Sequence, residues 1–208
     1  MVQRISAPPS TSTATSADRQ VDVTRYGPGE AAQTFTRGDF ILTHGNKMYD
    51  RLIHWAQGLK MHGDDRKYTR WNHAALIIDA VGTLVEANGD GVDCDSISKY
   101  TPTEYYLVHI EADDVERNNQ VMFGKWAEGQ RYGKLTICSV FLSLFFGSTI
   151  IFALQGQEIC SGLVARALER AGYIFEQDPA HIMPADLAKY FEVQPPAKGT
   201  PIGKPPKK

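Results

Sequence analysis

Cys160 is the residue of this chain best placed to act as a nucleophile. An apolar stripe at helical spacing follows it and stops before Gly172, so a helix is predicted to begin at Cys160. A cysteine in the first turn of a helix lies at the positive end of the helix dipole. With an imidazolium nearby, its pKa can fall from about 8.5 to roughly 3.5–7.5. The alternative is a small buried hydrophobic side chain at a helix start. The stripe consists of Leu163, Val164, Ala167, Leu168 and Ala171.

A thiolate nucleophile needs a base, and the base needs a group that orients it. Residues 73–79 (HAALIID) and 83–87 (TLVEA) are apolar runs joined by a short segment with a glycine, which predicts a β-hairpin. For a turn near residues 80 and 81, paired positions sum to about 159 or 161, and either sum puts His73 and Glu86 on one face. His73 is therefore the candidate base and Glu86 its orienting carboxylate. The alternative is that His73 caps a strand and Glu86 is a solvated edge residue.

Further strands and helices are predicted around this hairpin. Residues 40–42, after Gly38-Asp39, and residues 105–110 are short apolar runs typical of strands. One helix is predicted behind Asn46 as its N-cap, and a second opens at Asp113-Asp114 and closes at Gly129. The apolar positions at helical spacing are Met48, Leu52, Trp55 and Leu59 in the first helix, and Val115, Met122 and Trp126 in the second.

Several of these segments resemble one family of enzymes. Residues 160–164 (CSGLV) resemble the nucleophile segment of the NlpC-type cell-wall cysteine peptidases. Residues 129–133 (GQRYG) are similar to the Gly-x-x-Tyr stretch before that cysteine, and residues 73–78 resemble the histidine strand of the family. Here the histidine precedes the cysteine, which is the order of the circularly permuted, papain-like branch often called YiiX-like. Gly38-Asp39 and residues 184–187 (PADL) resemble its opening and closing segments.

The resemblance implies a fold, a site and a reaction. The fold would be α+β, a permuted papain-like domain whose antiparallel sheet packs against the helix that carries the cysteine. The catalytic residues would be Cys160, His73 and Glu86, with Tyr132 carried over as an oxyanion or substrate residue. The activity would be thiol-dependent hydrolysis of amide bonds in peptidoglycan stem peptides, without a cofactor. The segment between Tyr132 and Cys160 is longer and more apolar than the short loop of standard family members.

Three alternatives stay open from the sequence. Relatives of lecithin retinol acyltransferase share the permuted fold, so the chain could act on acyl lipids, although it lacks the Asn-Cys-Glu-His-Phe segment of that group. It could also be a structural protein with an unreactive cysteine. His181 is a rival base because it follows Cys160 in sequence. Cys94 and Cys138 are most simply structural thiols.

Composition predicts one domain with two tails. Residues 1–35 are predicted to be a disordered tail rich in Ser, Thr and Pro, residues 36–194 the hydrolase domain, and residues 195–208 a Pro- and Lys-rich tail. A net charge of -2 excludes a strongly basic nucleic-acid binder. Three cysteines are too few for a disulfide scaffold, which favours a reducing compartment. No signal peptide is predicted, so synthesis in the cytoplasm is expected, and a phage-encoded protein carried by the virion would fit.

The apolar run 135–154 contains no charged residue and is about long enough to cross a bilayer as a helix. A span there would place His73 and Cys160 on opposite sides of the membrane. Burial of this run inside the domain is therefore predicted, in two pieces interrupted by residues 147–149 (GST). The six histidines show no metal-binding spacing, so no metal site is expected.

Overall fold

The computed structural model describes residues 19–44, 48–88, 91–129 and 160–196. Within these residues, six strands form one antiparallel sheet in the order β1-β6-β2-β3-β4-β5. The protein therefore has the α+β character that the sequence predicts. The strands are β1 (Val21–Tyr26), β2 (Phe40–Thr43), β3 (His73–Ile77), β4 (Thr83–Asn88), β5 (Gly91–Ser96) and β6 (Tyr105–Ile110). The α-helices are α1 (Met48–Lys60), α2 (Asp114–Ala127), α4 (Cys160–Glu169) and α5 (Pro184–Tyr190), and the 3-10 helices are η2 (Gly63–Arg70), η3 (Ile97–Tyr100) and η4 (Pro179–His181).

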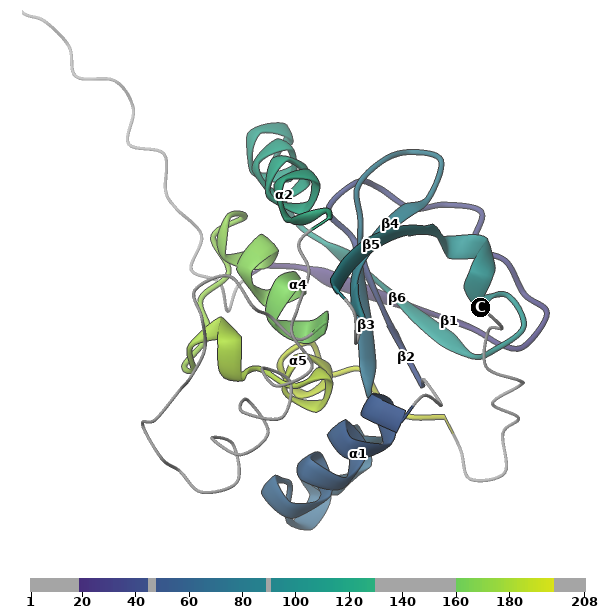
Figure 1. Cartoon of the computed structure of the whole chain (residues 1–208), viewed down its shortest axis with the longest axis vertical. Coiled ribbons are helices and arrows are strands. Elements are labelled where there is room, and N and C mark those ends of the chain that lie inside the picture. The colour runs from purple at the N-terminus through teal and green to yellow at the C-terminus, as the bar shows by residue number, and fades with distance from the viewer. Residues whose placement is uncertain (1–18, 45–47, 89–90, 130–159, 197–208) are drawn as a thin grey trace, which may run out of the picture.

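The sheet buries apolar side chains on both faces. One face packs against α2, α4 and α5, which lie together on one side of the sheet in Figure 1. The other face carries Ile41, Ala75, Ile77 and Leu84 and is covered by η3 and by apolar residues of the loop between β1 and β2. The strands β2 and β3 at the centre of the sheet are buried along their whole length, so their sequences are largely apolar, whereas β1 and β5 at the two edges carry exposed polar residues.

The predicted hairpin is confirmed, and its register is one of the two expected. Leu76 pairs with Val85 and Ile77 pairs with Leu84. Continued along the strands, this register places His73 opposite Asn88 and two residues from Glu86, on the same face. The helix from Cys160 is also confirmed, and Gly172 follows its end with a φ of 75°. Glycine suits this position because a side chain is strained at positive φ.

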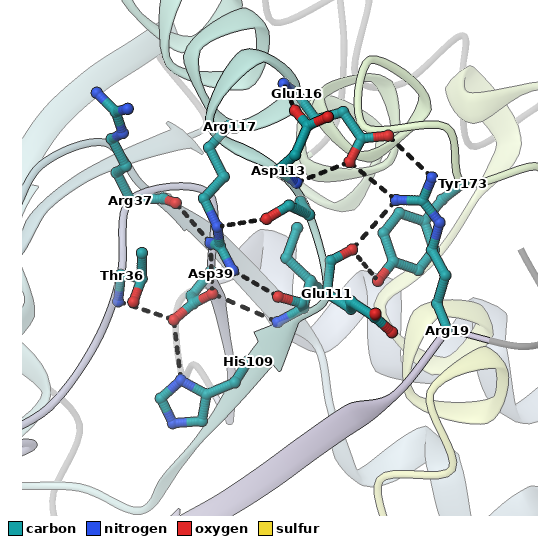
Figure 2. Close-up of polar contacts among 12 residues, drawn as sticks. Arg19, Thr36, Arg37, Asp39, His109, Glu111, Asp113, Glu116, Arg117 and Tyr173 are labelled. Carbon is teal, nitrogen blue, oxygen red and sulfur yellow. Dashed lines mark hydrogen bonds and ion pairs between the residues drawn. The ribbon is translucent and has the colours of Figure 1, made fainter. Parts of the chain in front are cut away.

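The predicted tail 1–35 is wrong for residues 19–35. These residues contain β1, which pairs with β6 from Val21↔Ile110 to Tyr26↔Tyr105. Just before β1, Arg19 makes a salt bridge with Glu116 of α2 at 2.9 Å (Figure 2). Arg19 also donates to the Ala171 carbonyl after α4. The prediction missed this strand because the rest of the predicted tail is polar and the partner strand lies far along the chain. Residues 1–18 and 197–208 lie outside the described residues.

The helices at 48–60 and 114–127 occur where they are predicted, but the stripe residues whose side chains are described do not form the core. Trp55 and Leu59 of α1, and Val115, Met122 and Trp126 of α2, are exposed. On α2, the contact with the sheet centres on Gly124. A Cβ at Gly124 would lie 3.0 Å from Ile78 Cγ2 and 3.2 Å from Leu76 Cδ2. Val121, Phe123 and Ala127 of α2 are also buried in the core, so the packed face of this helix is not the one that the predicted stripe marks.

Gly38-Asp39 joins the start of β2 to the end of β6 and to α2. Asp39 is fully buried, and its carboxylate accepts from the Thr36 amide at 2.8 Å, His109 Nδ1 at 2.9 Å and Arg117 Nη1 at 3.0 Å (Figure 2). Gly38 has a φ of 91°, and a Cβ there would collide with the Gln120 side chain. This pair of residues therefore anchors the fold at the end of β3 opposite His73.

We expect Asp39→Ala to lower the free energy of unfolding by about 3–5 kcal/mol, because it leaves the Arg117 guanidinium partly buried without its carboxylate. Urea unfolding followed by circular dichroism measures this. Asp114→Ala is the matched control, since the Asp114 carboxylate is 96% exposed in its pair with Arg37. If both variants unfold at the same urea concentration as the wild type, the proposed anchor is wrong.

Among the described residues, the structure shows no helix long and apolar enough to cross a bilayer. The run 135–154, predicted to be buried, lies outside the described residues, as does Cys138.

Candidate active site

His73 is the first residue of β3, and buried hydrogen bonds fix the chain that leads into it. Gln57 of α1 is fully buried, and its Nε2 donates to the Trp71 carbonyl at 2.8 Å. The other end of the same amide, Oε1, accepts from the Ala185 amide at the start of α5 at 2.8 Å. On the neighbouring strand, His73 pairs with Thr43. The backbone that leads into His73 is therefore tied to α1, α5 and β2, and the His73 residue is only 4% exposed.

Glu86 of β4 orients the imidazole of His73. His73 Nε2 lies 2.9 Å from Glu86 Oε2, and the Glu86 residue is fully buried. Burial opposes the negative charge, but His73, Lys99 and Tyr100 outweigh it and hold the pKa of Glu86 well below its usual range. An ionised carboxylate only accepts hydrogen bonds, so Nε2 carries a proton and donates it to Glu86.

This tautomer leaves Nδ1, the other ring nitrogen of His73, without a proton, so Nδ1 is the atom that can accept one. Among the described residues, Nδ1 is buried and has no regular hydrogen-bond partner. Burial opposes protonation of the ring, but the Cys160 thiolate and the Glu86 carboxylate outweigh it and raise the pKa of His73 to about 10. At neutral pH the ring is therefore an imidazolium when it faces the Cys160 thiolate.

Cys160 begins α4, which packs against β3. The next residue, Ser161, is fully buried and donates from Oγ to the Ile182 carbonyl at 2.6 Å, which ties the first turn of α4 to the segment between η4 and α5. The first amides of an α-helix have no partner within the helix and favour negative charge. The N-terminus of α4 therefore favours an oxyanion beside Cys160. The Cys160 residue is 2% exposed.

The structure brings together three of the four site residues that the sequence predicts, namely Cys160, His73 and Glu86. Tyr132 lies outside the described residues. His181, the rival base, lies in η4, is partly exposed, and makes no side-chain hydrogen bond or ion pair within the part of the chain that is described.

Two further residues of the site, Lys99 and Tyr100 of η3, were not predicted. Lys99 Nζ donates to Glu86 Oε1, and the Tyr100 hydroxyl donates to Glu86 Oε2. No local sequence pattern marks Lys99 and Tyr100, because η3 lies beside β4 only through the pairing of β5 with β4. A search for charged residues on, or just after, the strand that pairs with the strand of Glu86 could have found Lys99.

The described residues contain no cluster of three or more His, Cys, Asp or Glu side chains able to hold a metal ion. The chain matches no protein-family model, and no curated protein matches it.

The three-residue arrangement predicts that Cys160 reacts selectively with iodoacetamide near neutral pH. Cys94 is an exposed residue, but desolvation of its thiol and the Glu128 carboxylate raise the pKa of Cys94 to about 12, so Cys94 stays protonated. We expect Cys160 to be labelled faster than Cys94 by about two orders of magnitude. Mass spectrometry of peptides at successive times measures the rates. The protein unfolded in urea is the control, in which the thiols should react alike. Equal rates in the folded protein would contradict an activated Cys160.

Proposed function

We propose that this protein is a thiol-dependent hydrolase that cleaves amide bonds, with the permuted papain-like fold of the NlpC superfamily. The observation that carries the proposal is the buried pair of His73 and Glu86, in which Nε2 donates to Oε2 at 2.9 Å on a strand that packs against α4, the helix that begins at Cys160. A nucleophile, a base and an orienting group are the members of a catalytic triad. The α+β fold and the CSGLV run at residues 160–164 agree with it.

In the proposed reaction the Cys160 thiolate attacks the carbonyl carbon of the amide, while the Cys160 proton resides on His73. The negative charge that develops on the carbonyl oxygen is stabilised by the free amides of the first turn of α4. His73 then gives its proton to the leaving amine, and the thioester remains on Cys160. His73 takes a proton from water, and the resulting attack releases the acid and restores the thiol. Glu86 keeps the imidazole in one tautomer throughout.

We propose stem peptides of peptidoglycan as the substrate class. The support is the run at residues 160–164, which resembles cell-wall peptidases, and the absence from the sequence of the Asn-Cys-Glu-His-Phe segment of the acyltransferases. These two features favour amide over ester substrates.

The test offers purified protein two substrates side by side, muropeptide fragments and short-chain acyl esters. We expect new free amino groups from the fragments, quantified by amine derivatisation and mass spectrometry. The signal should disappear in Cys160→Ala and persist in Cys94→Ser, which is the matched control because it changes the other described thiol.

The remaining outcomes discriminate against the proposal. Acyl release from the esters alone, lost in Cys160→Ala, would identify an acyl-lipid hydrolase. No turnover of either substrate, together with slow labelling of Cys160, would identify a structural protein.

A further inference from the structure

We propose that Lys99 is a positioning residue that acts on the Cys160–His73 pair through the buried carboxylate of Glu86. Its catalytic meaning rests on the proposed function, but its contacts can be tested without any substrate.

The contacts of Lys99 place its charge on Glu86 from the side opposite His73. Lys99 Nζ donates to Glu86 Oε1, whereas His73 Nε2 donates to Oε2. The Lys99 side chain is only 16% exposed, and its second carboxylate partner, Asp95 at 2.6 Å, lies at the surface. Hydrogen bonds to Asp95 and Glu86 outweigh the effect of burial and raise the pKa of Lys99, so it stays an ammonium ion.

Tyr100 completes the cage around the carboxylate. Its hydroxyl donates to Glu86 Oε2, the oxygen that also accepts from His73. Its ring lies near the imidazole, with centroids 6.2 Å apart and an interplanar angle of 26°. The two consecutive residues of η3 therefore hold both oxygens of Glu86 and one face of His73.

A fully buried carboxylate with a single cation neighbour can gain a proton or change rotamer when that neighbour is neutral. The ammonium of Lys99 removes this option, because it compensates the Glu86 charge in every protonation state of His73. Glu86 then stays ionised and stays pointed at Nε2. The charged and titratable groups that face Glu86 or its partners are His73 from β3, Cys160 from α4, Asp95 from β5, and Lys99 and Tyr100 from η3.

The test measures the rate of carbamidomethylation of Cys160 by iodoacetamide between pH 4 and pH 9. Lys99→Met removes the ammonium and keeps the length of the side chain. We expect the acid limb of the profile to move to higher pH by about one unit, so that labelling is about tenfold slower at pH values below the wild-type midpoint. Lys99→Arg should keep the wild-type midpoint, and Lys125→Met, which removes an exposed charge on α2, is the matched control.

A double-mutant cycle shows whether Lys99 acts through Glu86. In a Glu86→Gln background there is no carboxylate to hold, so Lys99→Met should shift the acid limb by less than a third of its effect in the wild type. An equal shift in both backgrounds would mean that Lys99 acts directly on the thiolate and would overturn the proposal.

Two more outcomes separate this proposal from the proposed function. If wild-type Cys160 is activated but Lys99→Met leaves its profile unchanged, the role of Lys99 is wrong and the hydrolase proposal stands. If wild-type Cys160 reacts no faster than Cys94, the hydrolase proposal is wrong and the role of Lys99 is lost with it.

Discussion

Removal of the imidazole of His73 is expected to abolish hydrolysis of the peptide substrate. Loss of one member of a nucleophile–base pair lowers turnover by about four orders of magnitude or more. His73→Ala also leaves Glu86 buried without its main partner, so it can lower stability as well. His73→Gln is therefore the more informative variant, because its amide can still donate to Glu86 but cannot accept a proton from Cys160. Kinetics of muropeptide cleavage measure the loss, and circular dichroism verifies the fold.

His181→Ala is the matched control for His73. His181 is the histidine nearest to Cys160 in the sequence, and η4 packs against α4. We expect this variant to keep turnover within about twofold of the wild type, since the affected side chain makes no polar contact among the described residues. An inactive His181→Ala beside an active His73→Gln would refute the assignment of the base.

Loss of the Glu86 charge is expected to reduce turnover by about 10²- to 10⁴-fold without unfolding the protein. Glu86→Gln keeps the size of the side chain and can still accept from Lys99 through its amide oxygen. It removes the charge that stabilises imidazolium and the acceptor-only character that selects the tautomer. Turnover at saturating substrate reports the effect, and an unchanged urea midpoint would show that it is not a folding defect.

For Glu86→Gln, the direction in which the pH profile of turnover shifts can also be predicted. Burial lowers the pKa of His73, and the charges of Cys160 and Glu86 together raise it to about 10. In Glu86→Gln the burial stays and one of the two charges is gone, so the pKa of His73 must fall. Protonated His73 is the acid that serves the leaving amine. The alkaline limb of kcat/KM should therefore move to lower pH in the variant.

A shift of this limb to higher pH, or no shift, would contradict the role of Glu86. Asp93→Asn is the control, since Asp93 pairs with Glu86 across β4 and β5 in the backbone register but is exposed. It should leave the limb in place, because screening by water weakens its effect on the buried site.

Local patterns were sufficient to predict the pair His73 and Glu86. Two apolar runs joined by a short turn permit few registers, and side chains alternate with a period of two, so the residues on one face follow from the turn position. The start of α4 at Cys160 was equally local, because an apolar stripe and a terminal glycine mark a helix without reference to the rest of the chain. The sequence by itself therefore determined which residues of the hairpin and the helix could form a nucleophile, a base and an orienting group.

Only the tertiary structure decided what surrounds them. β1 belongs to the sheet because β6, whose residues lie 79 to 89 positions further along the chain than their partners, supplies its hydrogen bonds, and the polar composition around residue 20 carries no trace of that partner. Lys99 reaches Glu86 because β5 and η3 fold back along β4, and α2 packs through the face that carries Val121, Phe123 and Gly124 instead of the predicted stripe. Each of these contacts joins residues whose local sequence contains no pattern that predicts it. Their free energy comes from burial and charge pairing between distant segments, so a reading along the chain cannot find them.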